Sequence, residues 1–332
     1  MASKRLANTL PGLLALLAVS LTGCTDAPAP VATTAPPAIA PATDAAAQRQ
    51  LAYAYLDGQG VAQDDAEALA RFRLATAEGD VAALVGLGWM YEMGRGLAES
   101  NVEAARLYRQ AAESGNADGM VNLGNLYRLG HGVAADDAEA VRWYRRAVDK
   151  DSARGMSALA DMIGAGRGAP ESAAAALKLY RAAADKDDVA GMLGVARAYA
   201  YALGTARDDA ATIKWYQRAA AKESAVAYGS LGYIYENGRG VARDMVQAAK
   251  FHRQAAERGN TVSMVNLANM YLAGRGVPQS DAEGLRWYRE AAERGDRGGQ
   301  RMMGVMYSAG RGVPKDDEAA ARWFRRAAGE KV

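Results

Sequence analysis

Residues 117–152 read ADGMVNLGNLYRLGHGVAADDAEAVRWYRRAVDKDS and contain one full copy of the pattern that predicts the fold. The same 36-residue pattern recurs without insertion or deletion up to residue 332, in eight blocks that begin at Ala45, Val81, Ala117, Ala153, Val189, Ala225, Thr261 and Arg297. A fixed period of this length is typical of a solenoid, in which each repeat packs only against its neighbours. We therefore expect residues 45–332 to form one elongated array of eight repeats.

Each block is predicted to form two helices joined by a glycine turn. In the quoted block, Leu123 and Tyr127 are four residues apart and so share one helical face, and Gly124 leaves room for a neighbouring helix. Glycine accommodates the left-handed conformation that ends a helix. The second glycine of the turn is present in all eight blocks: Gly60, Gly96, Gly132, Gly168, Gly204, Gly240, Gly276 and Gly312.

The second half of each block carries the start signal and the packing residues of another helix. Asp136 and Glu139 have the spacing of a capping box, which marks a helix N-terminus. An aromatic pair follows, here Trp143 and Tyr144, and then Ala147, which is alanine at the same place in every block. Large rings beside small residues allow helices to interlock closely. The fold class is therefore all-α.

The repeating A-x-x-x-L-G-x-x-Y-x-x-G-x-G-V-x-x-D…A-x-x-W-Y-x-x-A-A-x-x-G resembles the Sel1-like repeat, a relative of the tetratricopeptide repeat, over the whole of 45–332. The resemblance implies a right-handed α/α superhelical solenoid that acts as a non-catalytic scaffold for protein–protein interactions. Two blocks depart from the pattern, and we expect altered local curvature there. The fourth has Ile163 and Asp187 in place of the usual Tyr and Gly, and the fifth has Ala202 and Leu203 in its turn.

Residues 1–23 have the organisation of a secretory signal peptide. Lys4 and Arg5 form a basic start, an apolar stretch covers 13–19, and Leu-Thr-Gly-Cys closes the segment at Cys24. These last residues resemble the lipobox of bacterial lipoproteins, which implies cleavage before Cys24 and acylation of its sulfur. Thr25 follows the cysteine, and the resemblance then favours the outer membrane, with the repeats facing the periplasm.

Residues 24–44 are predicted to be a flexible tether that follows the lipidated cysteine. The segment 25–44 is rich in Ala, Pro and Thr, contains five prolines and has no aromatic residue, so it cannot bury enough surface to fold. An extended proline-rich chain of this length could reach on the order of 60 Å. The tether would hold the repeats away from the bilayer.

Composition argues against most catalytic and nucleic-acid functions. Lys and Arg number 40 and Asp and Glu 38, and loss of Lys4 and Arg5 would leave a formal charge of zero, so a phosphate-neutralising binder of nucleic acid is excluded. Cys24 is the single cysteine, and the two histidines, His131 and His252, lie in turn and aromatic columns three repeats apart. We therefore expect no enzyme activity, no cofactor and no metal.

The residue two places after the repeated Leu should point from the first helix of each repeat into the concave groove. Across the repeats this column contains Tyr, Trp, Asn, Arg, Asp and Val but neither Lys nor Glu, which is the composition of an interface. A purely structural role in packing or solvation is the open alternative for each residue. The candidate partner-binding residues are Tyr53, Trp89, Asn122, Asn125, Arg197, Tyr233, Asn266 and Asn269.

The sequence thus favours a lipid-anchored envelope scaffold that binds other envelope proteins through its groove. Polysaccharide export, cell-wall and secretion assemblies are the settings considered. The alternative is a periplasmic lipoprotein that binds glycans or peptidoglycan fragments. An enzyme acting on such fragments is less favoured, because no serine-nucleophile motif is present.

Overall fold

The computed structural model describes residues 44–330, which form sixteen α-helices and no strand. The predicted signal peptide, Cys24 and nearly all of the predicted tether lie outside these residues. The helices are α1 (Ala45–Asp57), α2 (Asp65–Ala77), α3 (Val81–Met93), α4 (Asn101–Glu113), α5 (Ala117–Leu129), α6 (Asp137–Asp149), α7 (Ala153–Gly164), α8 (Ala173–Asp185), α9 (Val189–Tyr201), α10 (Asp209–Ala220), α11 (Ala225–Asn237), α12 (Met245–Glu257), α13 (Thr261–Ala273), α14 (Asp281–Glu293), α15 (Arg297–Ala309) and α16 (Asp317–Ala328).

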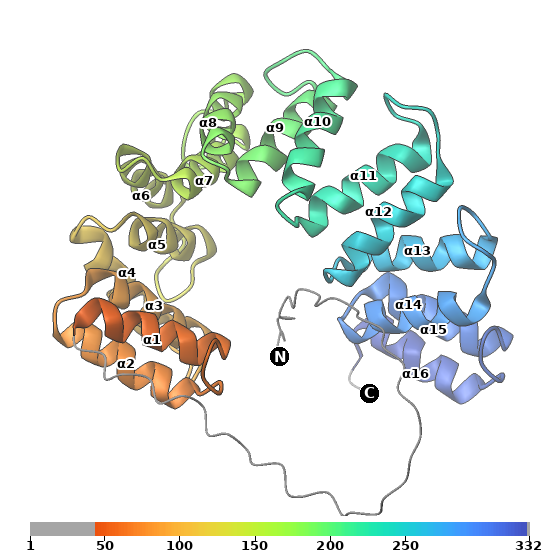
Figure 1. Ribbon diagram of the computed structural model, residues 1–332, viewed down its shortest axis with the longest axis horizontal. Helices are drawn as coiled ribbons and strands as arrows, with labels where there is room; N and C mark the ends of the chain where they lie inside the picture. The colour runs from red at the N-terminus through yellow and green to blue at the C-terminus, as the bar shows by residue number, and fades with distance from the viewer. Residues whose placement is uncertain (1–43, 331–332) are drawn as a thin grey trace, which may run out of the picture.

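Each repeat supplies one helix pair, and the pairs follow a single curved path from α1 and α2 to α15 and α16 (Figure 1). First helices of successive repeats contact one another directly, as α5 contacts α7 and α7 contacts α9. Second helices instead meet the next repeat through its first helix, as α8 meets α9. The first helices are thus the more closely spaced set, and they form the inner wall of the curve.

The predicted caps and turns are confirmed. The Asp136 carboxylate accepts a hydrogen bond from the Glu139 amide at 2.9 Å and so begins α6. Asp44, at the end of the predicted tether, caps α1 in the same way by accepting from the Ala47 amide at 2.7 Å. The first turn glycine ends most first helices in the left-handed conformation, as Gly130 does after α5 with φ +72°.

The second turn glycine is required for two reasons. It also has a positive φ, and its Cα lies against the preceding repeat: a Cβ on Gly276 would lie 1.9 Å from the carbonyl oxygen of Met245. Ala202 in the fifth repeat has φ +57° and ψ +38°, the conformation that glycine has at the same place elsewhere. The turn therefore has the same backbone conformation as the other turns, although alanine replaces glycine at position 202.

Two interlocking contacts build the core of each repeat and each junction. Within a repeat, the ring of the second helix covers the small residue beside the Leu, so that a Cβ on Gly124 would lie 2.6 Å from the Tyr144 ring. Between repeats, the invariant alanine meets a small residue at the start of the next first helix, as Ala111 meets Gly119. His252 takes the ring position in the sixth repeat, is 1% exposed and covers Gly232, as its column predicts.

Candidate functional site: the inner groove

Positions 2, 6, 9 and 13 of each repeat lie on one face of the first helix, because they are spaced by three or four residues. Most of the exposed large apolar side chains of the described residues occupy three of these positions. We call this set the apolar stripe: Tyr53, Met93, Leu129, Tyr201, Val226, Tyr233, Val262 and Val305. Single exposed apolar residues need no explanation, but a row of them along one face is typical of an interaction surface.

The stripe borders a cavity in repeats five to seven. Here α9, α11 and α13 border a cavity of about 390 Å³, lined by Tyr201, Val226, Tyr233 and Val262 of the stripe. Tyr201, Tyr233 and Val262 are 64%, 55% and 63% exposed, so their side chains remain accessible. Ser230 and Asn266 also line the cavity. The cavity therefore combines apolar and aromatic surface with a few hydrogen-bonding groups, as ligand and peptide sites do.

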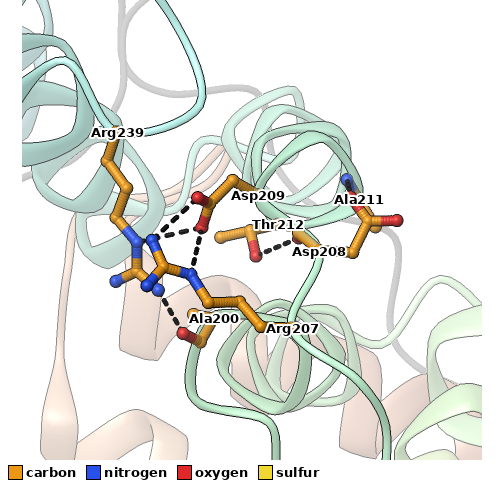
Figure 2. Close-up of polar contacts among 7 residues, drawn as sticks. All are labelled: Ala200, Arg207, Asp208, Asp209, Ala211, Thr212 and Arg239. Carbon is orange, nitrogen blue, oxygen red and sulfur yellow. Dashed lines mark hydrogen bonds and ion pairs between the residues drawn. The ribbon is translucent and has the colours of Figure 1, made fainter.

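A polar network fixes one side of this cavity (Figure 2). Arg239, in the turn of the sixth repeat, donates to Asp209 at 3.0 Å and also to the carbonyl oxygen of Ala200. Asp209 accepts from Arg207 as well, and hydrogen bonds from Arg207 and Arg239 lower the pKa of its carboxyl. Arg239 also lies over the Tyr201 ring at 5.5 Å. The network positions Tyr201 at the cavity edge and ties repeat six to repeat five.

The same Arg–Asp tie recurs along the solenoid. Arg95 pairs with Asp65, Arg167 with Asp137 and Arg311 with Asp281, in each case between the turn of one repeat and the second helix of the preceding one. Of the repeats after the first, two lack the arginine in the turn, and both also lack the aspartate 30 residues earlier. His131 is accompanied by Asn101, and Leu203 is accompanied by Ala173.

Two of the candidate asparagines have partners within their own repeat. The hydroxyl of Tyr144 donates to Oδ1 of Asn125 at 2.7 Å, and the hydroxyl of Tyr288 donates to Oδ1 of Asn269 at 2.5 Å. Tyr180 donates to Asp161 at the same position of the fourth repeat. These polar groups hold the ring of the second helix, and burial raises the pKa of all three tyrosines. The Asn side chains thus have a structural role that the sequence prediction did not separate from partner binding.

The candidate aromatics divide into packed and accessible residues. Trp89 is half-buried against the core of the first two repeats, and Arg95 lies over its ring at 5.6 Å. Tyr53 is 40% exposed and makes an edge contact with Phe72, with ring centroids 5.0 Å apart. Tyr233 remains the most exposed aromatic of the predicted set. The structure therefore favours the cavity region over the N-terminal repeats as the accessible aromatic surface.

The remaining candidates lie on the same face. Arg197 is close to Asp161 of the preceding repeat at 3.4 Å, and Asn122 accepts a hydrogen bond from Arg154 of the following repeat at 3.1 Å. Asn266 lines the cavity beside Tyr233. Arg197 and Asn122 thus bridge neighbouring first helices, whereas Asn266 belongs to the cavity wall.

Sequence reasoning missed the residues at positions 2 and 13, above all Tyr201, Val226 and Val262. The signal was available, because these positions lie seven residues before and four residues after the predicted column and share its helical face. A search of residues 44–330 finds no group of three or more His, Cys, Asp or Glu side chains placed to hold a metal ion. Within the same range, no helix has both the length and the apolar character needed to cross a membrane.

Comparison with known proteins identifies the repeat. The Sel1 repeat matches eight consecutive segments: 45–80, 81–116, 117–152, 153–188, 189–224, 225–260, 261–296 and 298–330. A solved protective antigen of uropathogenic Escherichia coli with an SLR fold is 31% identical, with a TM-score of 0.59 over 86% of this chain. The chain covers 62% of the length of that antigen.

A Sel1 repeat protein of Oxalobacter formigenes is 24% identical, with a TM-score of 0.61 over 86% of this chain and 82% of the other. The comparison with curated proteins gives no match. The chain therefore belongs to the Sel1 repeat family, whose solenoids generally serve as non-catalytic scaffolds for protein–protein interactions.

Proposed function

We propose that this protein is a lipid-anchored scaffold of the bacterial envelope that binds another envelope protein through the apolar stripe. The observation that carries the proposal is the cavity between α9, α11 and α13, where accessible Tyr201, Tyr233 and Val262 lie on the inner wall. Interface centres are enriched in aromatic side chains and depleted in charged ones, and the cavity has this composition.

The proposed cellular location is based on the sequence of the N-terminal segment. The basic start, the apolar stretch 13–19 and the Leu-Thr-Gly-Cys ending at Cys24 support export and acylation, and Thr25 supports the outer membrane with the solenoid in the periplasm. Acyl chains contribute about 0.8 kcal/mol for each buried CH₂, so two or more chains give stable attachment. The tether 25–44 would then place the groove within reach of envelope partners. Polysaccharide export, cell-wall and secretion assemblies remain the proposed settings.

The test is a site-specific crosslinking experiment in cells. A photocrosslinking amino acid at position 233 should capture a defined protein, and the triple variant Tyr201→Ala, Tyr233→Ala and Val262→Ala should reduce recovery of that protein by a crosslinker placed at Ser230. These side chains are exposed, so circular dichroism should remain that of the wild type.

A matched triple variant on the second helices, Leu74→Ala, Val102→Ala and Val246→Ala, removes similarly exposed apolar side chains outside the stripe. It should leave capture unchanged. Capture that survives the groove variant, or that falls equally in the control, would place binding elsewhere on the protein.

The second candidate, a glycan- or peptidoglycan-fragment-binding lipoprotein, is favoured by the size of the cavity, because about 390 Å³ with Tyr and Asn side chains is enough for a small ligand. Calorimetric binding of such fragments that is abolished by Tyr233→Ala, without a captured protein, would select it.

A further inference from the structure

The outward face of α16 resembles in sequence the faces that α6 and α14 bury against the next repeat. Trp143 and Trp287 are 7% and 6% exposed because they pack against the following first helix, whereas Trp215 at the same position is half-buried. Trp323 occupies the same position in α16, where no other repeat of the described residues covers it, and it is half-buried. Solenoids usually end in repeats with a polar outer face. In α16 this face instead keeps the Trp and the invariant alanine, Ala327.

The first helix α1 carries the matching half of the same junction. In three internal junctions, an arginine of the second helix donates to a tyrosine hydroxyl of the next first helix. Arg109 donates to Tyr127 and Arg181 to Tyr199, both at 2.7 Å, and Arg253 donates to Tyr271. The equivalent residues at the two ends of the solenoid are Arg325, which is exposed, and Tyr55, which is half-buried. Both partners are thus present, but at opposite ends of the protein (Figure 1).

Steric features of the junction are repeated at the ends as well. The invariant alanine requires a small residue opposite, and Ala47 stands where Gly119 meets Ala111. Each later second turn glycine fits against the preceding repeat: a Cβ on Gly312 would lie 2.7 Å from the carbonyl oxygen of Asp281. A Cβ on Gly60 meets nothing within 4 Å in this chain.

We propose that the solenoid associates head to tail with a second copy of this chain, so that α16 of one copy packs against α1 of the next. Ala327 would face Ala47, Arg325 would donate to Tyr55, and Gly60 would fit against the carbonyl oxygen of Asp317. The contact joins two different surfaces, so it generates an open chain of copies or a ring, and no symmetric dimer. Without a covalent link between repeats, the junction must offset the entropy of association, and assembly is concentration-dependent.

The experiment uses the full chain with Cys24→Ser, which removes the only native thiol. Ala47→Cys and Ala327→Cys are made in separate chains. Mild oxidation of the mixture should give a disulfide-linked dimer, while either variant alone should give none, because a head-to-tail contact never brings two copies of the same end together. A mixture of Ala327→Cys with Val102→Cys, on an exposed position of a second helix, controls for random collision.

A second pair of variants tests the register. Gly60→Ala in the Ala47→Cys chain should abolish the dimer band, because the added methyl would meet the Asp317 backbone of the partner copy. Gly79→Ala carries the same type of backbone strain in the same repeat, with φ +89° and nothing within 4 Å of its Cβ, and should leave the band. The proposal is overturned if the mixture gives no dimer, if a single variant or the Val102→Cys control gives as much, or if Gly60→Ala retains the band.

Discussion

A substitution at the second turn glycine of repeat seven would measure how much close packing between two repeats contributes to stability. Gly276 has φ +71°, and a Cβ on it would lie 1.9 Å from the carbonyl oxygen of Met245 and 2.3 Å from its carbon. Gly295, in the same repeat, has φ +86° and nothing within 4 Å of the position of its Cβ. An alanine at either site takes a left-handed conformation, but only the alanine at 276 collides with another repeat. The pair therefore separates backbone strain from contact between repeats.

The expected magnitudes follow from this geometry. Left-handed backbone costs a non-glycine residue about 1–2 kcal/mol, so Gly295→Ala should destabilise by about that amount. Gly276→Ala adds a clash with backbone atoms, which cannot rotate away as a side chain can, and overpacking of this kind costs about 1–3 kcal/mol more. We therefore expect a total loss of about 2–5 kcal/mol for Gly276→Ala, concentrated at the α12–α13 junction.

Native-state hydrogen exchange is the suitable assay, because a solenoid opens repeat by repeat and a single global unfolding free energy is poorly defined. Amides of α12 and α13 should exchange faster in Gly276→Ala than in Gly295→Ala, by a factor that corresponds to about 1–3 kcal/mol. Equal protection in the two variants would refute the conclusion that the glycine is required for close approach of the repeats.

Two further predictions concern the fifth turn and the anchor. Ala202→Gly should stabilise repeat five by up to about 1 kcal/mol, because Ala202 has φ +57° where other repeats use glycine, and faster amide exchange in α9 would contradict this. Cys24→Ser should move the protein out of the membrane fraction, because the anchor is expected to be acylated at this sulfur, and a membrane-bound species of mature size would show that attachment does not depend on it.

The helices, turns and caps could be predicted because the eight repeats of the chain can be compared with one another. Eight copies of the second turn glycine indicate a backbone requirement without any alignment, and Gly132 confirms it with φ +68° and a Cβ position 2.1 Å from the Asn101 carbonyl oxygen. A single column does not show what its residues contact, because the partner lies on another helix, as Tyr144 lies 19 residues after Asn125.

The role of Asn125 shows why the candidate site was harder to predict than the fold. An Asn on an exposed helical face binds a ligand, faces solvent or holds a neighbouring side chain, and its own column does not distinguish these outcomes. The partner column narrows the choice. Every Asn or Asp of the column is accompanied by a tyrosine, namely Tyr144, Tyr180 or Tyr288, although Tyr108 and Tyr216 accompany Trp89 and Arg197. Comparison of columns in pairs would have assigned Asn125 and Asn269 to ring positioning.

The ion pairs between a turn arginine and an aspartate of the preceding repeat also join two columns, here 30 residues apart. The junctions that lack such a pair show which contacts fix the register of the repeats. Leu203 and Ala173 replace the pair between repeats four and five, yet a Cβ on Gly204 would still lie 2.5 Å from the Ala173 backbone. Partly exposed ion pairs contribute only about 0–1 kcal/mol each, less than the contact that Gly276→Ala would disturb. The register therefore depends on the packing of glycine and alanine. The turn arginine can instead position side chains of the groove, as Arg239 positions Tyr201.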